Sequence, residues 1–225
     1  MQTTSQTKPK SIHSQALILI IGRVGSFTLT FFIPIFLARG LSPAEYGTFK
    51  QIFLIFTTLY LILQGGMVQS LYYFIPRDPD RNSSWIFQAT FFVTVAGLFA
   101  SIGLLLGADR LSVWFSNPSL VPYLPAVALF LVFMLASCHL ETALISQEQV
   151  STGSIVLFLS EMVRALFIIL PLLIGRSLSA VIAGLIAFAG LRLIVTLTYT
   201  IRILLRRENR GALMKIEALK TQLAY

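Results

Sequence analysis

The chain has 225 residues, of which 56% are hydrophobic and only 12% are charged. A soluble domain usually carries about 25% charged residues, so the composition argues against a soluble protein and predicts a polytopic membrane protein. The net charge of +8 would indicate nucleic-acid binding in a soluble chain. In a membrane chain it reflects basic residues at helix ends, so we expect no nucleic-acid partner.

Six segments are long and apolar enough to cross the hydrocarbon core, which takes about 20 helical residues. The first is too long for the apolar part of a signal peptide, so it is expected to stay as a membrane helix. The second is expected to break at Gly65-Gly66 and to continue as a shorter piece to residue 75. The sequence therefore predicts an all-α, polytopic transmembrane bundle over residues 14–204, with spans at roughly 14–38, 46–64, 84–107, 121–145, 151–175 and 178–204.

The segments outside the spans are short and polar. Residues 1–13 are expected to form a cytoplasmic N-terminal tail, and residues 108–118 an interfacial segment anchored by Trp114 and Phe115. Residues 205–225 form a basic, weakly amphipathic cytoplasmic tail that is expected to lie on anionic membrane lipids, with a solvated tail as the alternative.

The basic residues outside the spans predict the orientation. With the N-terminus inside, four lie on the outer side: Arg39, Lys50, Arg110 and Arg176. Ten lie on the inner side: Lys8, Lys10, Arg77, Arg81, Arg202, Arg206, Arg207, Arg210, Lys215 and Lys220. The positive-inside rule therefore places both termini in the cytoplasm.

Three arginines, Arg23, Arg164 and Arg192, fall inside predicted spans. An arginine at the bilayer centre costs about 2.5–3.5 kcal/mol on insertion scales, so such residues usually face a bundle interior or a wet cavity. Ser26 and Thr30 fall on the same helical face as Arg23, and this polar stripe is expected to line a cavity. The alternative for each arginine is a purely structural role through snorkelling or ion pairing.

A second polar stripe runs along the next helix, where Lys50, Thr57 and Gln64 are spaced by seven. In the fifth span Glu161 and Arg164 are three residues apart and are expected to form a charge pair.

Counted together, the three arginines and Glu161 leave 3 − 1 = +2 inside the membrane, which favours an anionic solute such as a pyrophosphate group. His139 and Glu141 are two residues apart and point away from each other on a helix, so they are interpreted as cavity-edge or interface residues.

The sequence contains no motif that is typical of an enzyme active site. There is no glycine-rich phosphate loop, no nucleophile elbow and no metal-binding motif, and the single Cys138 excludes cysteine-based metal sites. We therefore expect no enzyme activity, no metal and no cofactor. Two alternatives stay open: a small polytopic enzyme acting on lipid phosphates, and a non-transporting lobe that partners another membrane protein.

The first third of the chain resembles a known family. The matching features are Arg23 within GRVG, the turn LARGLSPAEYGTFKQI from residue 37, and the broken second helix QGGMVQSLYYFIP. Together they resemble the polysaccharide flippases, the O-antigen and exopolysaccharide transporters of the MATE-like flippase superfamily.

The resemblance implies a multi-pass protein of the bacterial inner membrane that flips a lipid-pyrophosphate-linked oligosaccharide for lipopolysaccharide or other surface polysaccharide assembly. Two lobes in that family form a V around a cationic cavity, and Arg23 is the residue that the resemblance carries over as cavity-facing. This chain has helices for one lobe, so a homodimer or a second six-helix half is the expected partner. The substrate-binding candidates are Arg23, Ser26, Thr30, Lys50, Thr57, Gln64, Arg164 and Arg192.

Overall fold

The computed structural model describes residues 12–206, and this part of the chain is all-helical, which confirms the expected fold class. Most of the predicted N-terminal tail (1–11) and of the predicted basic tail (207–225) lies outside the described residues. The α-helices are α1 (Ile12–Gly40), α2 (Pro43–Gln64), α3 (Leu71–Arg77), α4 (Asn82–Leu106), α5 (Ala108–Trp114), α6 (Leu124–Ala136), α7 (Leu140–Ser146), α8 (Val150–Gly175) and α9 (Leu178–Arg206). Two 3₁₀ turns complete the order, η1 (Pro79–Arg81) and η2 (Pro118–Tyr123).

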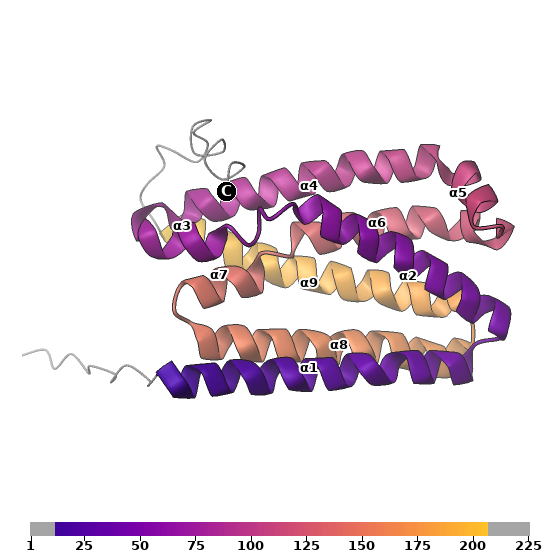
Figure 1. Ribbon diagram of the computed structural model, residues 1–225, viewed down its shortest axis with the longest axis horizontal. Coiled ribbons are helices and arrows are strands. Elements are labelled where there is room, and N and C mark those ends of the chain that lie inside the picture. Colours follow the sequence, from indigo (N-terminus) through magenta and orange to yellow (C-terminus); the bar gives the residue numbers. More distant parts are fainter. Residues whose placement is uncertain (1–11, 207–225) are drawn as a thin grey trace, which may run out of the picture.

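The long helices run side by side in layers (Figure 1). Helix α1 packs along α8, α8 packs on α9, α9 on α6, and α6 on α4, while α2 lies against α6 and α4. The α1–α2 turn, α5 and the α8–α9 turn meet at one end of the bundle, called here the α5 end. Helix α3, the α7–α8 turn, the start of α1 and the end of α9 lie at the other, the α3 end.

Five described segments are long and apolar enough to cross a membrane, so the chain is a multi-pass membrane protein. They are Pro43–Gln64, Asn82–Leu106, Pro118–Ser146, Val150–Gly175 and Leu178–Arg202. The predicted first span lies within α1, a continuous helix of 29 residues that is not among these five. The count of six spans and their orientation therefore stay predictions.

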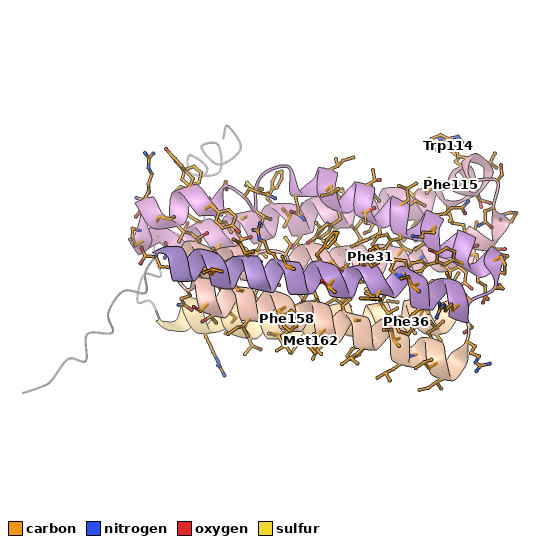
Figure 2. All side chains as sticks on the ribbon, turned by 60° about the horizontal axis from the view of Figure 1, so that its bottom comes forward. Phe31, Phe36, Trp114, Phe115, Phe158 and Met162 are labelled. Atoms are coloured by element: carbon orange, nitrogen blue, oxygen red, sulfur yellow. The ribbon has the colours of Figure 1, made fainter. Side chains whose placement is uncertain are left out.

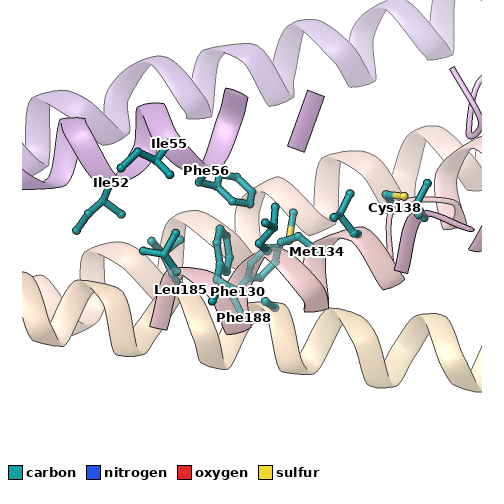
Figure 3. Close-up of a cluster of buried hydrophobic side chains, with 14 of the residues drawn as sticks. Ile52, Ile55, Phe56, Phe130, Met134, Cys138, Leu185 and Phe188 are labelled. Carbon is teal, nitrogen blue, oxygen red and sulfur yellow. The ribbon is translucent and has the colours of Figure 1, made fainter. Parts of the chain in front are cut away.

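Much of the core lies between α2, α6 and α9, and it extends to α1, α3, α4 and α8. Helix α6 is apolar on every side, and its Phe130 ring lies 4.5 Å from the Phe56 ring of α2, measured between centroids. Figure 3 shows this cluster, with Ile52, Ile55, Phe56, Phe130, Met134, Leu185 and Phe188 among its members.

The outside of the bundle is apolar as well, as a lipid-facing surface must be. Figure 2 shows Phe31 and Phe36 on α1 and Phe158 and Met162 on α8, all exposed at the surface. Trp114 is 79% exposed at the α5 end, in the segment where aromatic anchors are predicted. Exposed apolar surface of this extent marks a region that contacts lipid or another protein.

Residues within the turn between α1 and α2 stabilise the start of α2. Ser42 and Glu45 form a capping box, in which the Ser42 backbone N–H donates to Glu45 Oε2 at 3.1 Å and the Glu45 N–H donates to Ser42 Oγ at 3.3 Å. Pro43 occupies the first helical position. A backbone N–H at that position has no acceptor within the helix, so the lack of an N–H in proline costs no hydrogen bond. Glu45 Oε1 also accepts from the Leu178 backbone N–H at 3.1 Å, which ties this turn to the start of α9.

Two predicted spans are interrupted. The expected break after the second span is confirmed, because α2 ends at a left-handed Gly65 (φ 49°) and α3 follows a turn. The predicted fourth span, by contrast, is not one continuous helix. It divides into α6 and α7 around Ser137–His139, where the 137 and 138 amides bond to carbonyls three residues back.

Candidate functional site

The predicted charge pair lies on α8 and faces α1. Arg164 Nη2 forms an ion pair with Glu161 Oε2, which confirms the prediction. The Thr30 hydroxyl of α1 lies 3.2 Å from the same carboxylate oxygen and accepts from Arg164 Nη2 at 3.1 Å. That hydroxyl also lies 3.0 Å from the Ser26 carbonyl oxygen, and its single proton serves one acceptor at a time. Arg164 and Thr30, both predicted candidates, are thus brought together.

The third predicted arginine has a partner that the sequence count left out. Arg192 Nη2 of α9 lies 2.8 Å from Glu141 Oε2 of α7, and Arg192 Nη1 donates to Ser160 Oγ of α8 at 2.9 Å. The two charged side chains are 12% and 11% exposed. With Glu141 counted, the intramembrane excess is 3 − 2 = +1 and not +2.

These contacts leave hydrogen-bonding capacity inside the bundle. Arg164 Nε, Arg192 Nε and Glu141 Oε1 are buried and have no hydrogen-bond partner in residues 12–206. A buried donor without a partner costs about 1–3 kcal/mol, so each of these atoms favours any ligand or water that can satisfy it.

Tyr60 of α2 joins the two ion pairs into one region. Its phenol lies close enough to Arg164, Arg192 and Glu141 for their charges to act on it, and its ring stacks on Phe56 at 5.4 Å. Sequence reasoning missed Tyr60. The signal was present, because it lies three residues after Thr57 and four before Gln64, next to the predicted stripe of α2. We call the set Thr30, Tyr60, Glu141, Ser160, Glu161, Arg164 and Arg192 the polar centre.

A cavity of about 170 Å³ opens onto the polar centre between α7, α8 and α9. Glu141, Ser160 and Arg192 contribute its polar surface. Its walls are apolar and consist of Val156, Leu159 and Val163 from α8 with Phe188, Leu191 and Val195 from α9. The cavity is smaller than the roughly 300–1,000 Å³ of small-molecule sites, and its surface is almost wholly apolar.

The remaining predicted candidates lie apart from the polar centre. Arg23 is exposed on α1, and Ser26 is buried on the same helix. On α2 the Thr57 hydroxyl donates to its own helix at Phe53 O, 2.8 Å away, and the Lys50 ammonium lies 5.3 Å from the Tyr46 ring centroid.

Gln64 is the last residue of α2, at the start of the break. Helix α1 packs on α8 along its length and meets α2 near their connecting turn. The two predicted stripes therefore do not form one packed face.

His139 braces the break between α6 and α7. Its Nδ1 lies 2.9 Å from Thr90 Oγ1 of α4 and its Nε2 lies 3.1 Å from Thr200 Oγ1 of α9, and the residue is 1% exposed. Both ring nitrogens are hydrogen-bonded to threonine hydroxyls of neighbouring helices, so His139 lies at a helix interface. Within residues 12–206, no three His, Cys, Asp or Glu side chains gather into a possible metal site.

Comparison with known proteins identifies the family. No curated protein and no solved structure matches the chain. A family profile described as polysaccharide biosynthesis protein matches residues 36–216, which is well over half of the chain. This match includes α2 to α9 and all of the polar centre except Thr30. Together with the membrane-spanning helices and the resemblance of the first two helices, it establishes that the chain belongs to this family of polysaccharide biosynthesis proteins.

Proposed function

We propose that the chain is a transporter, not an enzyme, and that it flips a lipid-pyrophosphate-linked oligosaccharide across the bacterial inner membrane for surface polysaccharide assembly. One observation carries the proposal: the polar centre holds two arginines near the middle of membrane-spanning helices, and each keeps an Nε donor without a partner in the described part of the chain.

The physical need for such a centre follows from the substrate. A pyrophosphate headgroup in bare hydrocarbon is prohibitively unfavourable, because an isolated buried charge costs tens of kcal/mol by Born solvation. A guanidinium offers a planar fork of donors that matches phosphate oxygens in two parallel hydrogen bonds. The formal charges of the polar centre sum to 2 − 2 = 0, so its match to an anionic headgroup rests on the unpartnered Nε donors of Arg164 and Arg192 and not on net charge.

The sugar path in this proposal runs along the polar stripes of α1 and α2. Arg23, Lys50, Thr57 and Gln64 would line it, because guanidinium, amine, hydroxyl and amide groups can each bond to sugar hydroxyls, whereas Ser26 is buried. In this arrangement the polar centre binds the headgroup, and the stripes accommodate the glycan.

A flippase of this kind needs a second lobe, and we propose a second copy of the chain or a separate six-helix half. The start of α1 and the end of α9 lie at the same end of the bundle, which supports an arrangement of parallel lobes (Figure 1). The mass of the complex extracted in native lipid particles measures this, and a single chain without any partner would contradict it.

The proposal is tested by complementing a strain that lacks the gene. The wild-type chain and the control Arg110→Ala, which removes an exposed arginine of α5, are expected to restore surface polysaccharide. Arg164→Ala is expected to lower it about tenfold or more, since a hydrogen bond to a charged group contributes about 1.5–3 kcal/mol. Immunoblots of membrane fractions check that each variant inserts. Full polymer with Arg164→Ala at wild-type membrane levels would contradict the proposal, and so would full polymer in the deletion strain itself.

A further inference from the structure

A second polar pocket lies at the α5 end of the bundle, away from the polar centre. It has a volume of about 430 Å³ and lies between the start of α2, the α5–η2 loop and the start of α9. Six neutral polar side chains contribute to it: Thr48, Gln51, Ser116, Asn117, Ser119 and Tyr123. The volume falls in the roughly 300–1,000 Å³ range of small-molecule sites. We call it the end pocket.

The floor of the end pocket is held rigidly by hydrogen bonds between α2 and the loop. Asn117 Nδ2 donates to Gln51 Oε1 at 2.6 Å and to Thr48 Oγ1 at 3.0 Å. Gln51 Nε2 donates in turn to the Phe115 carbonyl oxygen at 3.3 Å, and Asn117 Oδ1 accepts from the Ser119 N–H at 3.1 Å. The amide groups therefore have fixed orientations before any ligand arrives, which lowers the entropy lost on binding.

Hydroxyl groups at the rim of the end pocket can still form hydrogen bonds with a ligand. The Ser116 and Ser119 hydroxyls make no hydrogen bond within the described residues, and the Tyr123 hydroxyl has a long contact of 3.4 Å to Ser179 Oγ. Ser116 takes a left-handed conformation (φ 48°), which is unfavourable for a residue with a side chain and is enriched at ligand sites. Gly47 also lines the pocket, and a Cβ built on it would meet no atom within 4 Å.

We propose that the end pocket binds a neutral sugar residue. A sugar hydroxyl both donates and accepts, and the pocket presents amides and hydroxyls that do the same. No lysine or arginine lines the pocket, so it does not suit a phosphate. The carboxylate of Glu45, its one acidic group, is already bonded to Ser42 and to the Leu178 N–H.

The inference rests on the proposed function, because that function delivers a glycan to this end of the bundle. The polar centre would bind the charged headgroup in the membrane, and the end pocket would bind the glycan where it emerges.

The test uses the purified full chain in lipid nanodiscs, with a panel of neutral and anionic tri- to pentasaccharides as the probe. Saturable binding of at least one neutral saccharide is expected. Gly47→Trp fills the open space over α2 and is expected to weaken that binding about tenfold, comparable with the loss of one good hydrogen-bonded contact. The matched control is Gly103→Trp on α4, whose Cβ position is equally open, and it is expected to bind as the wild type does.

A second variant tests the pocket without the bulk of a tryptophan, which could itself cause misfolding. Ser119→Ala removes one rim hydroxyl without adding bulk and is expected to weaken binding severalfold while the helical content measured by circular dichroism stays unchanged. Binding of no neutral saccharide, equal binding by Gly47→Trp, or a preference for anionic saccharides would each overturn the proposal.

The two proposals fail in different ways. If the deletion strain lacks polymer but the chain binds no neutral saccharide, the end pocket is not a sugar site and the transport proposal stands. If Gly47→Trp abolishes saccharide binding but the deletion strain makes full polymer, the pocket stands and the transport proposal fails.

Discussion

Arg164 and Arg192 are held in different ways, and the difference bears on how the protein could move. Arg164 pairs with Glu161 one turn away on the same helix, so that pair survives any rearrangement of whole helices. Arg192 on α9 pairs with Glu141 on α7 and bonds to Ser160 on α8, so its contacts change if these helices separate. Arg192 is therefore the arginine whose ion pair depends on the conformation of the bundle.

A charge-neutral double variant separates the two roles of Arg192. Glu141→Gln alone leaves a buried arginine unpaired and is expected to cost about 3–5 kcal/mol of stability. Arg192→Gln alone leaves the carboxylate unpaired, with a similar loss. The double variant buries no charge at this position, so it is expected to recover wild-type thermal stability in nanodiscs.

Surface polysaccharide gives the second readout of the same variants. The double variant is expected to remain defective, because it lacks the guanidinium that the headgroup needs. Restored polymer together with restored stability would mean that the pair serves packing alone.

The sequence could predict one of the two ion pairs, for a physical reason. Glu161 and Arg164 are three residues apart, so any helix places them together. Glu141 and Arg192 are 51 residues apart, and their contact depends on how α7 turns back onto α9. Helical periodicity describes a single helix, so it could find the stripe of α2 near Tyr60 but not the helices that the stripe faces.

At the level of elements, α8 and α9 approach each other closely at Gly184. A Cβ added to Gly184 would lie 1.8 Å from the Phe167 carbonyl oxygen, so the α9 backbone rests directly on the α8 backbone there. Small residues allow this approach, which is how membrane helices gain packing energy without a hydrophobic driving force.

Gly184→Ala is therefore expected to destabilise the bundle by about 1–3 kcal/mol or more, because the helices must move apart. The matched control is Gly190→Ala on the same helix, where the nearest atom to a Cβ is 3.9 Å away. Thermal unfolding in detergent, followed by circular dichroism, measures both variants. Equal melting temperatures would contradict the observed helix contact.

The break between α6 and α7 shows why hydropathy alone predicted too simple a fourth span. The residues around Ser137–His139 include neither glycine nor proline, and the preceding residues 124–136 are all apolar. What stabilises the break is tertiary, since His139 bonds to Thr90 of α4 and Thr200 of α9. A helix break at a glycine pair, such as Gly65-Gly66, can be predicted from the sequence. The break at Ser137–His139 has no such residues and could not be predicted.

At the scale of the whole molecule, composition and hydropathy gave the fold class and the membrane setting, and the turn near residue 37 led to the family. Neither composition and hydropathy nor the family resemblance could predict how the helices pack against one another. The chain order does not show that α1 lies along α8, yet that contact is what brings Thr30 to Glu161 and Arg164. The end pocket was missed for the same reason, because it joins three segments that are remote in sequence.

If the polar centre moves a lipid-linked glycan between leaflets, as proposed, the leaflet in which that glycan lies depends on the protein. In spheroplasts depleted of the protein, a membrane-impermeant reagent that labels glycans is applied from outside. Lipid-linked oligosaccharide is expected to accumulate but to stay unlabelled. The wild-type chain is expected to restore labelling, and Arg164→Ala is not. Equal labelling with and without the protein would contradict transport by this chain.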